Sequence, residues 1–324
     1  MTWDGLEVAA EDPRGSTVVV RRPAGDTFEY LLLHRAHEGP DHDGDWAWTA
    51  PAGARQPGEV VYPAALRELA EEAGIIGVEL LPVDLGRRQP WDGAGTWAVF
   101  VADVPAGTPV DLVDPEHDRY EWVPADEAAA RVLPSWVAER SFGPAVRRPA
   151  RRIGFRPMTY DDLPRLVEWR SRDHVTPWFP DRLAEAAHAR QRYGARIDGD
   201  HPVRMHVLEV DCRPAGYLQH YRVRDVEEYR GAVGDDEAVG IDYLIGEPEL
   251  AGGGLGPQMI WQYIRHVVLV AHPDVPRVVA SPDPANTRSI RALEKAGFTA
   301  GRLIELPDDN VELLCTFDVQ HWLG

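Results

Sequence analysis

The segment from residue 53 to residue 75 reads GARQPGEVVYPAALRELAEEAGI and decides the fold of the first half of the chain. Pro63 suits the first turn of a helix, the residues that follow are good helix formers, and Gly74 can close the C-terminus. Glu68, Glu71 and Glu72 then share one face, because their spacing is i, i+3 and i+4. We therefore predict a helix that gathers carboxylates on one side.

This acidic face favours a divalent cation. Like charges at helical spacing repel one another, and oxygen ligands suit Mg²⁺, which is shared with substrate phosphates. Glu59, just before the helix, adds a carboxylate, so the predicted metal ligands are Glu59, Glu68, Glu71 and Glu72. Arg67 stands one turn before Glu71 and can hold it by pairing. The alternative is a solvated acidic face. The fixed spacing of the flanking glycines and the arginine argues against it.

The spacing Gly53-x5-Glu59-x7-Arg67-Glu68-Leu69-x-Glu71-Glu72-x-Gly74-Ile75 resembles the Nudix box, with every fixed position filled. The resemblance covers roughly residues 16–140, and Ala52 stands where family members usually carry a second glycine. It implies an α/β/α sandwich that hydrolyses a nucleoside diphosphate linked to another group. It also implies that the glutamates bind Mg²⁺ or Mn²⁺, which activates water. The candidates for the general base are Glu116, His117, Glu68 and Glu72.

A second motif, Gly252-Gly253-Gly254-Leu255-Gly256, separates a β-rich run at 239–245 from a helix expected from Pro257 to about Val270. Glycines let backbone N–H groups approach a ligand, and the helix N-terminus adds partial positive charge. The loop is therefore predicted to hold a pyrophosphate. A flexible turn is the alternative for a short glycine run.

The run from Ser281 to Phe298, SPDPANTRSIRALEKAGF, follows a predicted strand. Together with the glycine loop it resembles the closing motif of GNAT acetyltransferases, over roughly residues 155–318. The resemblance implies a mixed central sheet, splayed between two parallel strands to admit the pantetheine arm of acetyl-CoA. It places the cofactor contacts at Leu244, Gly252, Gly253, Gly254, Leu255, Gly256 and Asn286.

Within this superfamily, Gly240-Ile241-Asp242, the glycine loop and Pro282-x-Pro284-x-Asn286-x-Arg288 resemble aminoglycoside 6′-N-acetyltransferases. The resemblance places Asp242 beside the acceptor amine, where a carboxylate can orient an ammonium group and accept its proton. A strand-end carboxylate bonded to backbone is the alternative. A preceding acidic stretch either lines a site for a polycationic acceptor or is a solvated loop: Asp225, Glu227, Glu228, Asp235, Asp236 and Glu237.

Two positions depart from the GNAT pattern. Ala251 begins the glycine loop where GNAT proteins commonly carry Gln or Arg, so we expect one phosphate contact to be lost. Leu293 occupies the helix position where many members carry a tyrosine that protonates the departing thiolate. Tyr243, Tyr263 or solvent can supply that proton, or the thiolate leaves unassisted. Direct attack by a bound amine needs no cysteine nucleophile.

Length and charge exclude several classes of protein. The chain of 324 residues predicts two domains, and its net charge of -19 disfavours binding to nucleic acid. It has no apolar run that could span a bilayer, and acidic early residues predict no secretion signal. Two cysteines do not make a disulfide framework, so we expect a cytoplasmic protein with reduced thiols. The expected partners are small molecules.

The segment from Ser141 to Pro157, SFGPAVRRPARRIGFRP, has three prolines, two glycines and five arginines, which is typical of a linker. We predict a Nudix domain over 1–143, a linker over 144–154 and a GNAT domain over 155–324. The arginines are expected to be solvated, with an anion-binding patch as the alternative.

Hydrophobic patterning predicts the elements around these motifs. In the first part the predicted strands are 16–21, 30–34, 96–102 and 120–123, and the predicted helices 125–131 and 134–140. In the second part they are helix 160–170, strands 205–210, 215–221, 239–245 and 277–281, and a helix from Asn286.

The motifs together predict a bifunctional enzyme of mixed α/β (α+β) class. The first half would hydrolyse a nucleotide derivative, and the second would N-acetylate an aminoglycoside-like compound. One alternative makes the first domain a nucleotide sensor that regulates the transferase, against which the complete carboxylate set argues. Another changes the acceptor to a polyamine, a siderophore precursor or a protein amine.

Overall fold

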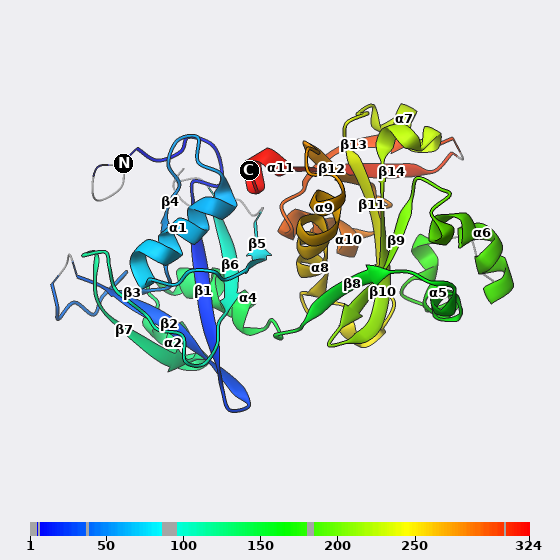
Figure 1. The fold of residues 1–324 in the computed structure, drawn as a ribbon. Helices are drawn as coiled ribbons and strands as arrows, with labels where there is room; N and C mark the ends of the chain where they lie inside the picture. Colours follow the sequence, from blue (N-terminus) through cyan, green and yellow to red (C-terminus); the bar gives the residue numbers. More distant parts are fainter. Residues whose placement is uncertain (1–4, 6, 37–38, 86–95, 180–184, 308) are drawn as a thin grey trace. The chain divides into compact units, whose positions relative to one another are not determined.

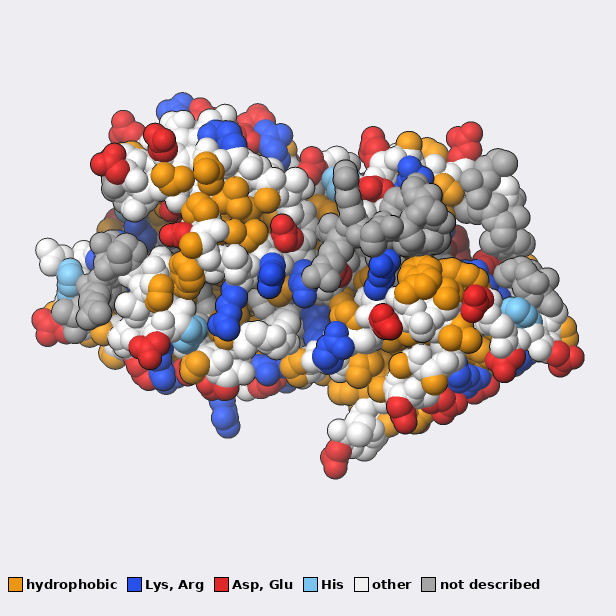
Figure 2. All heavy atoms as spheres, turned by 180° about the vertical axis from the view of Figure 1, so that it is seen from behind, with side chains coloured by type: hydrophobic (Ala, Val, Ile, Leu, Met, Phe, Trp, Pro, Cys, Tyr) orange, Lys and Arg blue, Asp and Glu red, His pale blue; other side chains and the backbone are white. Residues whose placement is uncertain are grey.

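The chain folds into two compact units, one formed mainly by residues up to Ala150 and the other mainly by residues 151–294 and 298–319 (Figure 1). This computed structural model describes residues 5, 7–36, 39–85, 96–179, 185–307 and 309–324. Within those ranges no helix combines the length and hydrophobicity of a membrane span. Figure 2 shows acidic and basic side chains interspersed on the face seen there.

The first unit is built on a mixed sheet with strand order β3-β2-β1-β6-β5, while β4 pairs with β1 and β7 with β2. β1 and β2 form a hairpin at Gly25, whose φ of 62° favours glycine. β1 runs parallel to β6. The four predicted strands are confirmed as β1, β2, β6 and β7, and β5 was not predicted. The strands are β1 (Gly15–Ala24), β2 (Thr27–Arg35), β3 (Trp48–Thr49), β4 (Ala52–Ala54), β5 (Leu80–Asp84), β6 (Trp97–Asp103) and β7 (His117–Pro124).

Helices cover both faces of this sheet. Tyr62 of α1 packs edge-on against Phe100, with ring centroids 6.0 Å apart, and Phe142 of α4 packs against Tyr30 at 6.2 Å. The β1 residues that pair with Phe100 and Tyr30 are three positions apart, so these two contacts lie on opposite faces. The unit is the predicted α/β/α sandwich. Its helices are α1 (Val61–Ala73), α2 (Ala125–Arg131), α3 (Ser135–Arg140) and α4 (Phe142–Val146).

The segment predicted as a linker contains regular structure: α4 lies inside it, and β8 (Ile153–Pro157) ends it. Its arginines are not all solvated, because Arg148 is buried and donates a 2.7 Å hydrogen bond to the Pro82 carbonyl. The buried guanidinium of Arg21 donates to the Arg148 carbonyl at 2.5 Å. Burial lowers the pKa of Arg148 to about 9. The prediction that the arginines are solvated was wrong for Arg148, because the Pro82 carbonyl replaces water as an acceptor for its guanidinium.

The second unit holds a seven-stranded sheet of order β13-β14-β12-β11-β10-β9-β8, antiparallel at every pair except β11–β12. The predicted strands are confirmed, whereas β13 and β14 were not predicted. Besides β8, the strands are β9 (Arg204–Val210), β10 (Arg213–Arg222), β11 (Val239–Ile245), β12 (Arg277–Ala280), β13 (Thr299–Glu305) and β14 (Val311–Asp318).

The parallel pair β11–β12 separates after a short contact. Only Val239 and Gly240 of β11 are in register with β12, opposite Val278 and Val279. β11 continues to Ile245, whereas β12 ends at Ala280. The sheet is therefore splayed between its two parallel strands, as predicted.

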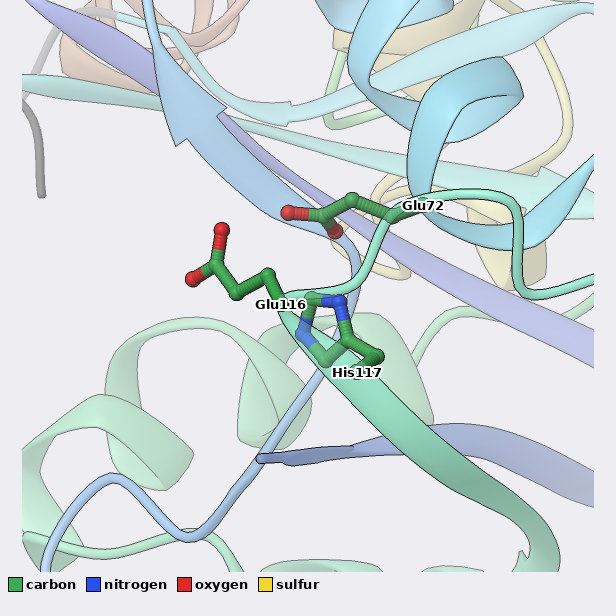
Figure 3. A group of neighbouring side chains, drawn as sticks. All are labelled: Glu72, Glu116 and His117. Atoms are coloured by element: carbon green, nitrogen blue, oxygen red, sulfur yellow. The ribbon is translucent and has the colours of Figure 1, made fainter. Parts of the chain in front are cut away.

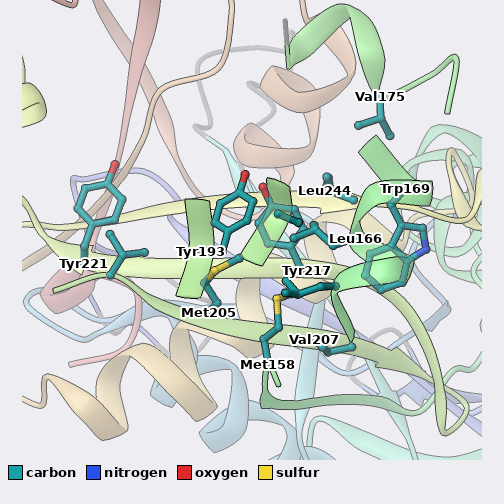
Figure 4. Close-up of a cluster of buried hydrophobic side chains, with 13 residues drawn as sticks. Met158, Leu166, Trp169, Val175, Tyr193, Met205, Val207, Tyr217, Tyr221 and Leu244 are labelled. Atoms are coloured by element: carbon teal, nitrogen blue, oxygen red, sulfur yellow. The ribbon is translucent and has the colours of Figure 1, made fainter. Parts of the chain in front are cut away.

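Helices cover both faces of this sheet as well. On one face, Trp169 and Tyr193 pack on sheet residues such as Met205 and Tyr217 (Figure 4). On the other, Tyr263 of α8 packs on Phe155 of β8, with ring centroids 5.1 Å apart. α8 begins at Leu255, two residues earlier than predicted. The helices are α5 (Leu163–Arg170), α6 (Ala186–Asp198), α7 (Glu227–Val233), α8 (Leu255–Tyr263), α9 (Leu269–Ala271), α10 (Thr287–Lys295) and α11 (Val319–Trp322).

Candidate functional site

α1 carries the predicted acidic face and ends as predicted at Gly74. This glycine has φ 66°, and its N–H donates to the Ala70 carbonyl. The three glutamates differ in exposure: Glu72 is 3% exposed, whereas the side chains of Glu68 and Glu71 are 12% and 51% exposed. Glu68 and Glu72 therefore face inward, and Glu71 lies at the solvent boundary.

Arg67 holds the outer carboxylates in place. Its Nε and Nη2 donate to the two oxygens of Glu59 at 2.7 and 2.9 Å, and Nη1 donates to Glu71 at 2.8 Å. Nη1 also lies 2.9 Å from Glu68. The predicted pairing of Arg67 with Glu71 is confirmed. Because the planar guanidinium reaches three carboxylates, it fixes their spacing.

The turn before α1 is fitted to the inner carboxylates. The Ala52 N–H donates a 2.9 Å hydrogen bond to Glu72, a contact that any residue type can make. A Cβ on Gly53 would lie 2.1 Å from the carboxyl carbon of Glu68. A side chain at position 53 would therefore displace this carboxylate, which explains why glycine stands there.

Burial raises the pKa of Glu68 to about 7, against the opposing effect of Arg67. Burial also raises the pKa of Glu72. Buried carboxyl groups whose ionised form is disfavoured suit a cation site, because a bound divalent cation stabilises the ionised form.

Glu72 is joined by two residues at the start of β7. One ligand atom from each of Glu72, Glu116 and His117 lies within 4.8 Å of the others (Figure 3). Arg35 of β2 lies opposite His117 in the strand register, and its Nε is 3.4 Å from Glu116. The structure thus brings both base candidates from the loop to the acidic helix.

His117 is 5% exposed, and neither of its ring nitrogens has a hydrogen-bond partner among the described residues. Burial, with a smaller contribution from Arg35, lowers its pKa to about 4, so the imidazole is neutral at neutral pH. Carboxylate oxygens and a neutral imidazole together fit a divalent cation. Sequence analysis placed His117 among the base candidates and gave no signal for a role beside the metal.

In the second unit, Asp242 lies on β11 just beyond its last pair with β12. Gln219 of β10 donates a 2.7 Å hydrogen bond to its carboxylate, and Arg196 of α6 donates to Gln219 at 3.0 Å. Burial raises the pKa of Asp242, and the Gln219 hydrogen bond opposes that rise. The carboxylate is therefore held by a side-chain amide at the point where the sheet opens.

The glycine loop turns into α8 through positive φ angles, 88° at Gly252 and 81° at Gly254. Gly254 is the N-cap of α8. A Cβ on Gly256 would come within 3.0 Å of the Ala292 methyl group, so this glycine lets α8 approach α10 closely. The first N–H groups of α8 have no partners inside the helix and are available to an anion.

Asn286 precedes α10, and its side-chain oxygen accepts a 3.1 Å hydrogen bond from the Ser289 N–H. The Tyr243 hydroxyl lies 2.7 Å from the Ser289 hydroxyl, so Tyr243 reaches from β11 to the first turn of α10. Leu293, buried, stands one turn later on the same helix. Tyr243 is thus beside the helix that lacks the usual tyrosine.

Tyr263, the other candidate proton donor, is buried in the core. The hydroxyl of Tyr263 lies 3.0 Å from Nδ1 of His206 and 3.0 Å from Nδ1 of His220. Burial lowers the pKa of His206 to about 4 and that of His220 to about 3, and it raises the pKa of Tyr263. Of the two tyrosines, the geometry favours Tyr243 as a proton donor.

The acidic stretch before β11 is largely structured. Glu227 and Glu228 begin α7, Asp236 pairs with Arg230 at 2.7 Å, and Asp235 pairs with Arg277 at 2.5 Å. These ion pairs reduce the attraction that the stretch offers to a cationic acceptor.

Family models match the two halves separately. A NUDIX domain model matches residues 12–144, and an acetyltransferase (GNAT) domain model matches residues 159–306. The chain joins a Nudix hydrolase domain to a GNAT acetyltransferase domain. Both domains indicate enzymatic activity.

Curated relatives follow the same division. The GNAT half is 29% identical over 159 residues to the aminoglycoside N(6′)-acetyltransferase type 1 of Klebsiella pneumoniae, covering 48% of this chain and 78% of that protein. The Nudix half is 35% identical over 105 residues to the asymmetrical bis(5′-nucleosyl)-tetraphosphatase of Sus scrofa, covering 31% of this chain and 67% of that protein.

Similar solved structures include an aminoglycoside acetyltransferase in complex with paromomycin and acetyl-CoA. Its sequence is 26% identical, and the match covers 52% of this chain and 94% of that chain, with a TM-score of 0.48. An Ap4A hydrolase of C. elegans is 26% identical, covers 39% and 88% of the two chains, and has a TM-score of 0.31.

Proposed function

We propose that the GNAT domain transfers the acetyl group of acetyl-CoA to the 6′-amine of an aminoglycoside-like compound. The position of Asp242 carries this proposal: its half-buried carboxylate stands where β11 leaves β12, held by Gln219. The name of the Klebsiella pneumoniae relative supports the acceptor class. Because Asp235 and Asp236 are paired with arginines, we assign recognition of the cationic acceptor to Asp242 rather than to the acidic stretch.

In the proposed reaction, Asp242 orients the acceptor ammonium group and takes its proton. The freed amine nitrogen attacks the thioester carbonyl carbon, a C–N bond forms, and the C–S bond breaks to release the CoA thiolate. The nitrogen then gives its second proton to solvent and becomes the neutral amide. The pyrophosphate rests on Gly252, Gly253, Gly254, Leu255 and Gly256. Leu244 and Asn286 contact the pantetheine arm, and Asn286 also holds the first turn of α10.

Tyr243 supplies the proton that the CoA sulfur gains in this proposal. Its hydroxyl is anchored to Ser289, one turn before Leu293 on α10. Burial raises the pKa of Tyr243, so the phenol is protonated at neutral pH. A tyrosine from β11 thereby replaces the tyrosine that many GNAT proteins carry on the helix.

For the Nudix domain we propose hydrolysis of a dinucleoside polyphosphate, the class in the name of the Sus scrofa relative. Glu59, Glu68, Glu71 and Glu72 would hold Mg²⁺ or Mn²⁺, with Arg67 fixing the outer carboxylates. When bound, such a cation would supply Lewis-acid chemistry to the phosphates and would lower the pKa of a water molecule. Glu116 is the proposed base that takes the proton from the attacking water.

Two single-residue variants of the full chain test both halves together. Glu72→Gln should abolish metal-dependent hydrolysis of a dinucleoside tetraphosphate and leave thiol release from acetyl-CoA unchanged. Asp242→Asn should do the reverse. If wild type shows neither activity with either substrate class, the proposal is wrong. If one variant loses both activities, a folding defect must be excluded by its thermal melting curve.

A further inference from the structure

We infer that His117 is a nitrogen ligand of the divalent cation that Glu72 binds, so that the Nudix centre prefers Mn²⁺ and later transition metals over Mg²⁺. This inference deepens the proposed hydrolase function and rests on it. The four predicted metal ligands are all glutamates, and His117 adds a different donor chemistry to them.

The first support is the state of the imidazole. His117 is buried, and among the described residues neither of its nitrogens has a hydrogen-bond partner. Buried polar atoms are nearly always satisfied, so an orphaned ring points to a partner such as a metal ion or an ordered water.

His34 in the same unit shows the contrast. It is fully buried, but its ring nitrogens lie 2.7 Å from a carboxylate oxygen of Asp118 and 2.8 Å from the carbonyl oxygen of His42. The surroundings of β2 and β7 thus satisfy one buried histidine and leave the other unsatisfied.

The second support is the placement of His117 beside carboxylates. A ring nitrogen lies within 4.8 Å of oxygens of Glu72 and Glu116, a separation that one small cation can bridge (Figure 3). Arg35 balances part of the charge of Glu116 from 3.4 Å. With His117 and Glu72 holding the cation, Glu116 would remain as the neighbouring carboxylate that takes the proton of the attacking water.

The consequence is a shift in metal preference. Oxygen-only sites suit Mg²⁺, whereas imidazole suits Mn²⁺, Co²⁺, Ni²⁺ and Zn²⁺ better, in the general order of affinity for nitrogen-containing sites. Removal of this nitrogen should therefore weaken Mn²⁺ binding more than Mg²⁺ binding.

Pulsed electron paramagnetic resonance of Mn²⁺ bound to the full-length protein tests this ligand without any substrate. A coordinated imidazole gives nitrogen modulation, which should be present in wild type, absent in His117→Asn and retained in His42→Asn. His42 offers a control because only its backbone carbonyl supports His34. Wild type labelled with ¹⁵N-histidine should show the ¹⁵N pattern, which keeps the test valid if His117→Asn does not fold.

Titration of the same proteins gives the expected size of the effect. Loss of one ligand should weaken Mn²⁺ binding by about tenfold or more, and Mg²⁺ binding by less than about threefold. Bound Mn²⁺ without histidine modulation in wild type overturns the inference and leaves the proposed hydrolase intact. Absence of Mn²⁺ binding overturns the inference too. An assay for metal-dependent hydrolysis then tests the proposed hydrolase function separately.

Discussion

Gln219 Nε2 donates a 2.7 Å hydrogen bond to Asp242 Oδ2 across the antiparallel pair β10–β11. Arg196 approaches Gln219 from α6 and donates to its amide oxygen at 3.0 Å, which fixes the amide orientation. A carboxylate at the opening of the sheet is thus held from one side by a chain of two side chains. We propose that the acceptor amine approaches the carboxylate from its other side, and the effect of the Gln219 contact can be measured.

Removal of the Gln219 amide should shift the pH dependence of acetyl transfer. Asp242 can accept a proton only when ionised, burial raises its pKa, and the Gln219 hydrogen bond lowers it. In Gln219→Leu the lowering contribution is lost, so the acidic limb of kcat/KM should move to higher pH than in wild type. Gln191→Leu, an exposed change on α6, should leave the profile in place. An unshifted limb in Gln219→Leu argues against Asp242 as the base.

Loss of the Tyr243 hydroxyl should slow the chemical step. In Tyr243→Phe we expect kcat for acetyl transfer to fall by about tenfold to a hundredfold, with KM for acetyl-CoA nearly unchanged, since general acids contribute to this order. Tyr263→Phe is the matched control: it should lower the free energy of unfolding by about 1–3 kcal/mol through its lost hydrogen bonds, and leave kcat close to wild type. Equal kcat values for wild type and Tyr243→Phe would show that the thiolate leaves without this donor.

A methyl group at position 53 should disable the hydrolase alone. The Cβ of Gly53→Ala would lie 2.1 Å from the Glu68 carboxyl carbon, so this carboxylate must move. A shift of about 1 Å at a catalytic group can cost about a hundredfold in rate. Hydrolysis should fall by that order, with acetyl transfer unaffected. Gly107→Ala meets no atom within 4 Å and should keep full hydrolase activity. Normal hydrolysis by Gly53→Ala would show that the reaction does not depend on the position of the Glu68 carboxylate.

Asp162 should stabilise the GNAT domain in a pH-dependent way. Its carboxylate accepts hydrogen bonds from Arg156 at 2.8 and 2.7 Å and from the Thr159 N–H at 2.9 Å. Burial alone would raise its pKa, but these bonds outweigh burial and lower it. A lowered folded-state pKa gives stability that is present above the ordinary carboxyl pKa and lost as the pH falls through the folded-state value.

The measurement is urea unfolding of wild type and Asp162→Asn at several pH values. The variant should be less stable by about 1–3 kcal/mol at neutral pH, and the difference should shrink toward low pH. A difference that is independent of pH would assign the effect to packing rather than to the charge. Asp161→Asn, at the exposed neighbouring position, serves as the control.

Local patterns predicted the parts of both sites that lie on single elements. The helix of the Nudix box, its glycine end and the Arg67–Glu71 pair follow from residues within one turn of each other, and so does the helix after Asn286. Patterns of this kind depend on neighbours in sequence, which is why they could be predicted.

The rest depends on pairing between distant segments. His117 reaches the acidic helix only because β7 pairs with β2, with Arg35 opposite His117. Tyr263 looks available in the sequence, but the fold places it between His206 and His220. Arg148 was expected in solvent because it stands among prolines and arginines, and it is buried against the Pro82 carbonyl. None of these contacts leaves a periodic signal in the chain.

The most direct test of the account is thiol release from acetyl-CoA by the full-length protein with matched pairs of aminoglycosides. One member of each pair carries a 6′-amine, and the other carries a 6′-hydroxyl. We predict steady turnover with the amines only, lost by about a hundredfold or more in Asp242→Asn, since a general base contributes to this order. Equal turnover with the 6′-amine and the 6′-hydroxyl compounds would contradict the proposed acceptor. Turnover that is unchanged in Asp242→Asn would contradict the role of Asp242.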